Sequence, residues 1–260
     1  MNLRKKALEI RRTLLNMHYM AKAGHIGTGL SAIDLLTYIY GSWLRPQDQF
    51  ILSKGHGASS LYATLNNFNL LTTAELATYY QEGTLFPAHP APRAHPCIPV
   101  ATGSLGHGLP IAAGIAFANK HIHRNDKRVA CILSDGDCNE GSVWEAAMFA
   151  AHHGLSNLVM VVDANGLQGF GKSTDVLNME PFAGKWKAFG FDVREINGHD
   201  FTAMEAAFLP SDKPVCVLAR TIKGKGISFM ENKIEWHYLP MNESQFNAAI
   251  AELNTISEAA

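Results

Sequence analysis

Two uninterrupted apolar segments constrain the fold of this 260-residue chain more than any other feature. Residues 129–134 read VACILS and residues 158–163 read LVMVVD, and a segment with helical spacing separates them. Residues 191–196 and 214–219 are two further strand candidates, separated by a short helical segment. Strands that are apolar on both sides are typical of parallel sheets covered by helices. The pattern therefore predicts an α/β fold in which a parallel sheet carries helices on both faces.

The rest of the chain predicts further helices without a clear domain boundary. Apolar residues at helical spacing predict a first helix that stops near Gly24, where the glycine-rich AGHIGTG begins. A second helix is expected from Ser31 to Gly41, and a last one from Ser244 to Leu253. The six prolines of residues 83–110 exclude regular structure there. We expect a single domain over residues 1–260.

Composition excludes several classes of function. The 22 basic and 23 acidic side chains give a net charge of −1, which argues against electrostatic binding of nucleic acid. No apolar run approaches a membrane span, and the basic N-terminus lacks the apolar region of a secretory signal. The four cysteines form no C-x-x-C pair, so neither a zinc site nor a disulfide framework is indicated. We expect a cytoplasmic protein.

Polar residues follow both apolar segments. Asp135-Gly136 comes after the first and Asn165-Gly166 after the second, so both pairs are expected at the same carboxyl edge of the sheet. A carboxylate, an amide oxygen and backbone carbonyls suit Mg²⁺ or Ca²⁺, and Mg²⁺ also takes phosphate oxygens. Gly136 would let the backbone approach a phosphate closely. Each pair taken alone is equally typical of an ordinary turn after a strand.

Together, these residues resemble a known cofactor motif. SDGDCNEG, then a helix, an apolar strand and Asn-Gly look like the thiamine-diphosphate motif, in which Gly-Asp-Gly is followed roughly 25 to 30 residues later by Asn. Ser134 stands where the family has its first glycine. The resemblance implies Mg²⁺ (or Ca²⁺ or Mn²⁺ in its place) bound by Asp135, Asn165 and the backbone carbonyl of Leu167.

Four more segments resemble the N-terminal, diphosphate-binding half of transketolase. They are AGHIGTGLSAIDLL, ILSKGHGASSLYA, TGSLGHG and RTIKGKGISFMENKIEWH, and the similarity runs from about residue 3 to 253. By this resemblance, the cofactor would be bound by Thr28, His56, Gly103, Ser104, Leu105, Gly136, Asn165, Lys223 and His237. The catalytic residues would be His25, His89 and His237.

The twelve histidines divide by their position in the sequence. His25, His56 and His89 lie in glycine- or proline-bound loops, which suits contact with a ligand. Five others lie on predicted helices and are expected to be ordinary: His18, His121, His123, His152 and His153. The sequence leaves His95, His107 and His199 undecided. His107 replaces the glutamine usual in the family, and Glu140 matches a family glutamate that also suits an ordinary helix start.

The resemblance also implies a partner. In transketolases the glutamate that activates thiamine diphosphate belongs to a second, pyrimidine-binding domain, for which this sequence has no matching sheet. We therefore expect a transketolase-type transferase that works only with a C-terminal, pyrimidine-binding subunit, in an α₂β₂ assembly. It would use thiamine diphosphate to transfer a two-carbon ketol unit from a ketose phosphate to an aldose or aldose phosphate acceptor. Neither nucleic acid nor a membrane is an expected partner.

Two other functions stay open at the level of sequence. The alpha subunit of a 2-oxo acid dehydrogenase shares the Asp-Gly and Asn pair, although the KGHG and EWH segments resemble transketolase more. A non-catalytic module that binds the cofactor or a partner is the second alternative. A nicotinamide-binding Rossmann protein is disfavoured, because no G-x-G-x-x-G follows a first strand.

Overall fold

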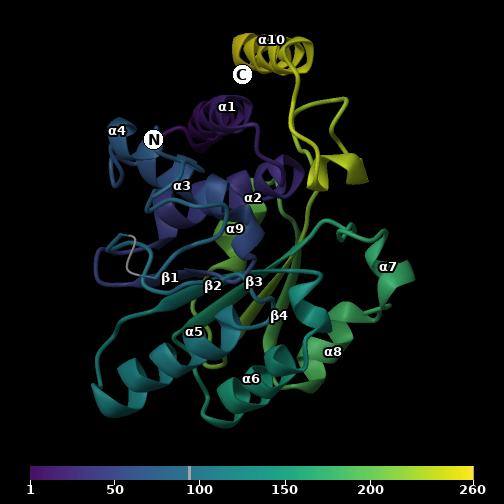
Figure 1. The fold of residues 1–260 in the computed structure, drawn as a ribbon. Helices are drawn as coiled ribbons and strands as arrows, with labels where there is room; N and C mark the ends of the chain where they lie inside the picture. Colours follow the sequence, from purple (N-terminus) through teal and green to yellow (C-terminus); the bar gives the residue numbers. More distant parts are fainter. Residues whose placement is uncertain (93–94, 260) are drawn as a thin grey trace. The chain divides into compact units, whose positions relative to one another are not determined.

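A computed structural model of the chain describes residues 1–92 and 95–259 (Figure 1). Two residues of the proline-rich segment, Arg93 and Ala94, lie outside this described part. The chain forms two compact units. Unit 1 consists of Met1–Ser42, Gly55–Ala101 and Thr221–Ala260, and unit 2 of Trp43–Lys54 and Thr102–Arg220. The single domain expected over residues 1–260 stays a prediction.

Unit 2 is built on a sheet of five parallel strands. They are β1 (Gln49–Leu52), β2 (Val129–Ser134), β3 (Leu158–Ala164), β4 (Asp192–Asn197) and β5 (Val215–Arg220). The strand order is β1-β2-β3-β5-β4, and Ser134 at the end of β2 lies opposite Asp163 in β3. Every residue of β2 and β3 is buried. The parallel sheet predicted from the two apolar segments is thereby confirmed.

Helices cover the sheet of unit 2 on both faces, as predicted. The helices are α5 (Gly108–Phe117), α6 (Gly141–His152), α7 (Ser173–Val176), α8 (Phe182–Ala188) and α9 (Phe201–Ala207). In Figure 1, α5, α6 and α8 lie on one side of the strands and α9 lies on the other. Along the strand order, the chain moves in one direction from β1 to β4 and then steps back from β4 to β5. Because crossovers between parallel strands are right-handed, this backward step places its helix, α9, on the opposite face of the sheet.

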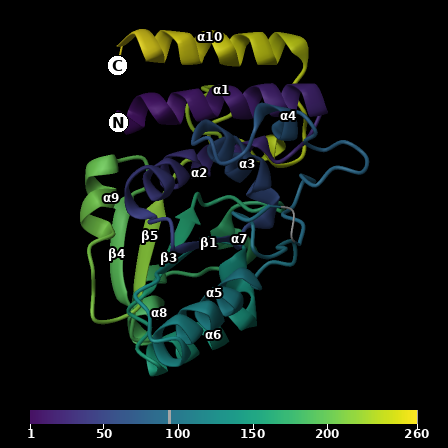
Figure 2. The same cartoon turned by 90° about the vertical axis from the view of Figure 1, so that its left-hand side faces the viewer.

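Unit 1 is helical. Its helices are α1 (Leu3–Ala21), α2 (Ile26–Tyr38), α3 (Ala58–Asn67), α4 (Thr73–Leu76) and α10 (Glu243–Ala259). Figure 2 shows α10 lying alongside α1, where the rings of Tyr19 and Phe246 stack with centroids 4.3 Å apart. None of the helices in the described part of the chain is long and apolar enough to cross a membrane.

The expected start of the second helix is wrong. The sequence predicted a start at Ser31, but α2 begins at Ile26, inside the glycine-rich segment. Gly29 is needed for packing rather than for a turn, because a Cβ at this position would lie 3.1 Å from the Leu14 side chain. A glycine that permits close helix contact cannot be told from a helix-breaking glycine by sequence alone.

From the sequence, Thr72 or Thr73 is expected to cap a helix that ends near Gly83. This helix exists but is shorter than predicted. Thr72 caps α4 in a capping box with Glu75, yet the helix ends at Leu76 and not near Gly83. Further along the expected helix, Tyr80 adopts a left-handed backbone with φ of 61°, which a helix does not contain. The last helix also differs, since α10 runs beyond the expected Leu253.

Candidate active site

The carboxylate of Asp135 is buried at the carboxyl edge of the sheet in unit 2. Only 5% of Asp135 is exposed, and its Oδ2 accepts hydrogen bonds from the Gly166 N–H and the Ser173 hydroxyl, both at 2.8 Å. Burial raises the pKa of the Asp135 carboxyl, and the nearby charge of Asp163 adds to this rise, while the Ser173 hydrogen bond opposes it. A bound cation would offset this cost of burying the charge.

The loop after β3 folds back on itself beside Asp135. The Asn165 Oδ1 accepts a hydrogen bond from the Leu167 N–H at 3.1 Å, and the Ser173 N–H donates to the Gly166 carbonyl at 2.9 Å. Gly166 has a φ of 75°, the left-handed backbone that favours glycine. These bonds fix the loop that carries both Asn165 and Leu167.

The residue types at this edge fit an oxygen-bound cation. Asp135 and Asn165 are 5% and 8% exposed, and they offer a carboxylate and an amide oxygen. Among the described residues, no group of three or more His, Cys, Asp or Glu side chains could hold a metal ion. Mg²⁺ accepts a carboxylate and an amide oxygen and completes its shell with phosphate or water.

An unsatisfied amide suits the diphosphate that would accompany the cation. The Asn139 Nδ2 is buried without a hydrogen-bond partner among the described residues, while its Oδ1 accepts from the Gln168 Nε2 at 2.8 Å. Gln168 also lies beside Gly136, where a Cβ would be 3.5 Å from the Gln168 Oε1. A buried donor at this position fits an anionic oxygen. Asn139 was not among the residues expected from the sequence, although it lies within SDGDCNEG.

The glycine-rich loop TGSLGHG is held by a buried aspartate that the sequence motifs do not reveal. Asp137 is fully buried and accepts hydrogen bonds from the Gly106 N–H at 2.9 Å, the Ser53 hydroxyl at 2.6 Å and the Ser134 N–H at 2.8 Å. Gly106 has a φ of 81°, and a Cβ there would lie 2.5 Å from the Cβ of Glu140. The turn therefore requires glycine at this position.

The other residues expected in this loop are more accessible. Gly103 and Ser104 are exposed, Leu105 is half-buried, and His107 is exposed where α5 begins. Glu140 is also exposed and makes no side-chain hydrogen bond as the N-cap of α6. These positions leave backbone and side-chain groups of the loop available to a ligand.

A buried ion pair lies next to Asp135 and Asn165 at the carboxyl edge of the sheet. The Lys54 Nζ donates to the Asp163 Oδ2, and both side chains are completely buried. Such a pair is costly to break, because the remaining charge would be left uncompensated. Lys54 follows β1 closely in sequence, so the pair joins the end of β1 to β3 within unit 2. The pair was not foreseen, since neither residue has a neighbour in sequence that signals the pairing.

Unit 1 gathers the four histidines singled out from the sequence. The ring of His25 lies 5.7 Å from that of His56, 5.9 Å from that of His89 and 5.1 Å from that of His237, measured between centroids. All four side chains are half-buried. The N–H of His25 donates to the carbonyl of His237 at 3.0 Å, so the two segments are also joined through their backbones. We call these four residues the histidine cluster.

Lys223 and Thr28 complete the set of expected residues in unit 1. Lys223 is 1% exposed, and its Nζ lies 2.8 Å from the Nδ1 of His237. Thr28 is equally buried in α2, with its hydroxyl 3.4 Å from the Nε2 of His56. The cluster therefore lies beside a buried cation and a hydroxyl group.

Two rings of the histidine cluster, those of His25 and His89, favour the neutral imidazole. Burial lowers the pKa of His25, and the charges of His89 and Lys223 lower it further. Burial alone lowers the pKa of His89. A neutral imidazole carries one donor and one acceptor nitrogen, so each of these rings can accept a proton near neutral pH and give it up again once it is protonated.

Comparison with known proteins decides the family. The thiamine diphosphate binding domain of transketolase matches residues 4–255. The chain belongs to the transketolase family. It is 37% identical over 264 residues to one subunit of the apulose-4-phosphate transketolase of Actinobacillus succinogenes, covering 96% of this chain and 95% of that protein. It is 36% identical over 265 residues to the 6-deoxy-6-sulfo-D-fructose transketolase subunit SqwG of a Clostridium species, covering 97% and 96%.

Solved transketolases have the same fold. The transketolase of Leishmania mexicana superposes with a TM-score of 0.89 at 26% identity, and that of Campylobacter jejuni with 0.88 at 28%. Each comparison covers 98% of this chain but only 41% and 43% of the solved chain. The predicted fold and the predicted resemblance to the N-terminal part of transketolase are thereby confirmed.

Proposed function

We propose that this chain is the diphosphate-binding subunit of a two-subunit transketolase. The observation that carries the proposal is the histidine cluster around His25. Two relatives that match this chain over nearly their full length are named as subunits of transketolases. The reaction is the transfer of a two-carbon ketol unit from a ketose phosphate to an aldose or aldose phosphate. The partner supplies the pyrimidine-binding domain, in an α₂β₂ assembly located in the cytoplasm.

The oxygen donors at the sheet edge would hold the cofactor through its metal. In this proposal Asp135, Asn165 and the Leu167 carbonyl bind Mg²⁺, for which Ca²⁺ or Mn²⁺ could substitute. Within unit 2, Gly136 would contact the diphosphate. Within unit 1, the residues proposed to bind the cofactor are Thr28, His56, Lys223 and His237. The backbone of Gly103, Ser104 and Leu105 binds the aminopyrimidine. Bound thiamine diphosphate supplies a site that stabilises negative charge on carbon while the ketol unit leaves its donor.

The histidines would handle protons. His25 and His237 hold and move protons at the hydroxyl and carbonyl oxygens of the donor, while His89 orients the substrate. Because burial and neighbouring positive charge depress the pKa of His25, its ring is neutral at pH 7 and can accept a proton from a hydroxyl group. Histidine suits both directions of transfer, since its ordinary pKa lies near the working pH.

The experiment is a product analysis of the chain mixed with its candidate partner, the product of the neighbouring gene. With thiamine diphosphate and Mg²⁺, xylulose 5-phosphate and an aldose should give a ketose that is two carbons longer than the aldose. Acyl transfer from pyruvate to a lipoyl acceptor, without ketol transfer, would instead support the dehydrogenase alternative. Cofactor binding without turnover on either substrate set would support a non-catalytic module.

A further inference from the structure

His18 is a buried histidine of α1, in unit 1, that the proposed reaction does not use. Only 1% of the residue is exposed, and both nitrogens of its ring have a hydrogen-bond partner. The Nδ1 lies 3.2 Å from the Ala23 carbonyl oxygen, and the Nε2 lies 2.8 Å from the Ser59 hydroxyl oxygen. Burial lowers the pKa of His18 to about 4, so the ring is neutral at pH 7.

The two partners determine which nitrogen of His18 carries the proton. A carbonyl oxygen can only accept a hydrogen bond, so the Nδ1 of His18 donates to Ala23. The Nε2 of the neutral ring then accepts, and the Ser59 hydroxyl donates to it. Rotating the ring would leave buried polar atoms without partners, which is costly. The hydrogen bonds therefore fix both the tautomer and the orientation of the His18 ring.

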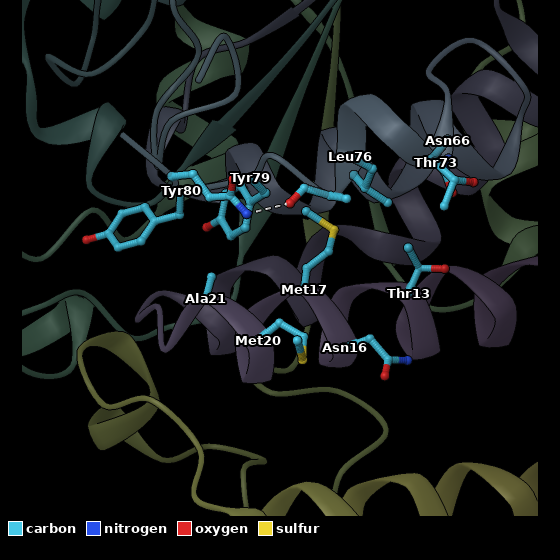
Figure 3. Close-up of a pocket in the computed structure, with 12 residues that line it drawn as sticks. Thr13, Asn16, Met17, Met20, Ala21, Asn66, Thr73, Leu76, Tyr79 and Tyr80 are labelled. Atoms are coloured by element: carbon cyan, nitrogen blue, oxygen red, sulfur yellow. Dashed lines mark hydrogen bonds between the residues drawn. The ribbon is translucent and has the colours of Figure 1, made fainter. Parts of the chain in front are cut away.

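Tyr79 covers His18 on the side of a cavity. The cavity has a volume of about 590 Å³, and the residues that line it include Met17 of α1 and Tyr79 (Figure 3). The ring of Tyr79 lies 6.0 Å from that of His18, measured between centroids, and Tyr79 is itself buried. Water in the cavity is thus kept from the hydrogen bonds of His18, which are stronger without this competition.

His18 holds both polar groups of the Ala23 backbone. The Ala23 N–H donates to the His18 carbonyl at 3.3 Å, while the Ala23 carbonyl accepts from the His18 ring. Ala23 is buried and lies two residues before His25, in the turn that joins α1 to α2. Lys22, which caps α1 with a left-handed φ of 50°, also donates its N–H to the His18 carbonyl. His18 thus anchors this turn to α1.

His25, at the end of the turn, has an unfavourable backbone conformation. Its φ of 69° lies in the left-handed region that few residues other than glycine adopt. Strain of this kind persists only where the surrounding contacts impose it. The hydrogen bond from the His25 N–H to the His237 carbonyl holds the residue on one side, at 3.0 Å. Ala23, which His18 fixes, holds it on the other.

We propose that His18 is a positioning residue for ketol transfer, because it holds His25 in the conformation that keeps its ring in the histidine cluster. This role rests on the proposed function, in which His25 is a catalytic residue. His18 acts through its hydrogen bond to Ala23. The bond to Ser59 adds a second connection, since Ser59 follows His56 by three residues, so His18 joins the segments that carry two members of the cluster.

Kinetics of the reconstituted two-subunit enzyme test this role, with xylulose 5-phosphate as donor and ribose 5-phosphate as acceptor. His18→Phe keeps an aromatic ring but removes both hydrogen bonds, so kcat should fall by about tenfold as His25 is misplaced. KM for xylulose 5-phosphate should change by less than about twofold, since the interaction lost belongs to proton transfer. His18→Gln, which can still bond to Ala23 and Ser59, should keep kcat within about twofold of the wild-type value.

Two comparisons separate positioning from a general loss of stability. The matched control is Leu65→Ala, which removes a fully buried side chain from α3 more than one helical turn beyond Ser59, and its kcat should stay within about twofold of wild type. In a His25→Ala background, His18→Phe should change kcat by less than about twofold, because its effect passes through His25. A tenfold loss in both backgrounds, an equal loss in Leu65→Ala, or an unchanged kcat in His18→Phe would overturn the positioning role.

A measurement on the wild-type chain depends neither on activity nor on the folding of a variant. Nitrogen-15 NMR of the histidine rings distinguishes the two neutral tautomers, and the signal of His18 is assigned by its loss in His18→Gln. We expect the proton of His18 on Nδ1 at pH 7. A proton on Nε2 would overturn the role of His18 even in an active enzyme. Absence of ketol transfer by the wild type, with the proton on Nδ1, would overturn the proposed function and leave the anchoring of the turn by His18 intact.

Discussion

The ammonium of Lys223 lies 2.8 Å from the Nδ1 of His237, and Lys223 is almost completely buried. A charged lysine can only donate, so the Nδ1 of His237 accepts and the neutral ring carries its proton on Nε2. Lys223 thus fixes the tautomer of one proposed catalytic histidine and, through its charge, lowers the pKa of another, His25.

Removing the charge of Lys223 should raise the pKa of His25. Burial is the largest cause of the depression of that pKa, and the charges of His89 and Lys223 contribute in the same direction. Lys223→Met therefore shifts the His25 pKa upward, toward its ordinary value, without restoring it fully. Titration of the histidine side chains by NMR measures the shift. Lys233→Met, which removes an exposed lysine of the same segment, should leave the pKa unchanged.

Buried His18 should make the protein less stable in mild acid. Burial lowers the pKa of His18 to about 4, from an ordinary value of 6.5. The unfolded chain therefore binds a proton between these values that the folded chain does not, and stability falls as the pH drops. From pH 6.5 to pH 5 this residue should account for about 1.5 kcal/mol of lost unfolding free energy.

The comparison that isolates this contribution is His18→Gln, because glutamine can still bond to the Ser59 hydroxyl and the Ala23 carbonyl, the two partners of His18. Urea denaturation at both pH values should show a smaller loss in the variant than in the wild type. An equal loss in both proteins would mean that His18 is not the group that titrates.

Two glycine-to-alanine changes in unit 2 should act in opposite directions. A Cβ on Gly106 would lie within 3 Å of Glu140 and Ser142, and the φ of 81° at Gly106 disfavours alanine. Gly106→Ala should therefore lower the free energy of unfolding by about 3 kcal/mol and weaken cofactor binding. Gly114 lies inside α5, and a Cβ added there would have no atom within 4 Å. Gly114→Ala should therefore raise the free energy of unfolding by about 0.5–1 kcal/mol. Thermal or urea denaturation measures both changes, and destabilisation by Gly114→Ala would contradict the packing described for α5.

Asp135→Asn should separate cation binding from folding. Burial raises the pKa of the Asp135 carboxyl, so its charged form opposes folding at neutral pH, and the neutral amide should increase the free energy of unfolding without metal. The amide oxygen can still accept from Gly166 and Ser173. Calorimetry should show a loss of at least about 100-fold in Mg²⁺-dependent affinity for thiamine diphosphate. The control is Asp175→Asn, which makes the same change at an exposed site in α7 and should leave the affinity for thiamine diphosphate unchanged. An unchanged affinity for thiamine diphosphate in Asp135→Asn would refute the metal assignment.

The sequence was sufficient to predict the sheet and its carboxyl edge. Fully apolar strands imply a parallel sheet, and parallel geometry alone brings the residues after β2 and β3 to one edge, so Asp135 and Asn165 could be identified. Their loops also hold recognisable glycine patterns. His25, His56 and His237 could be selected because each lies within a segment that resembles transketolase, and His89 because it lies in a proline-bound loop. The structure shows that these four residues are neighbours.

The contacts that depend on packing could not be predicted. Asp137 holds Gly106 across 31 residues, and Lys54 pairs with Asp163 across 109 residues, distances in sequence over which no local pattern signals a contact. The start of α2 was misplaced because Gly29 serves helix packing. The left-handed Tyr80 was also unforeseen, since its conformation is maintained by the turn around it and not by its own propensity.

The most direct test of the central claim is a titration of ketol-transfer activity against the partner subunit. At fixed chain concentration, with thiamine diphosphate, Mg²⁺ and xylulose 5-phosphate, activity should be absent without the partner and should rise to a plateau at equimolar subunits. His25→Ala should retain cofactor binding in the same mixture but lose turnover by about 100-fold, the usual contribution of a general acid–base. Full activity of the isolated chain would contradict the account.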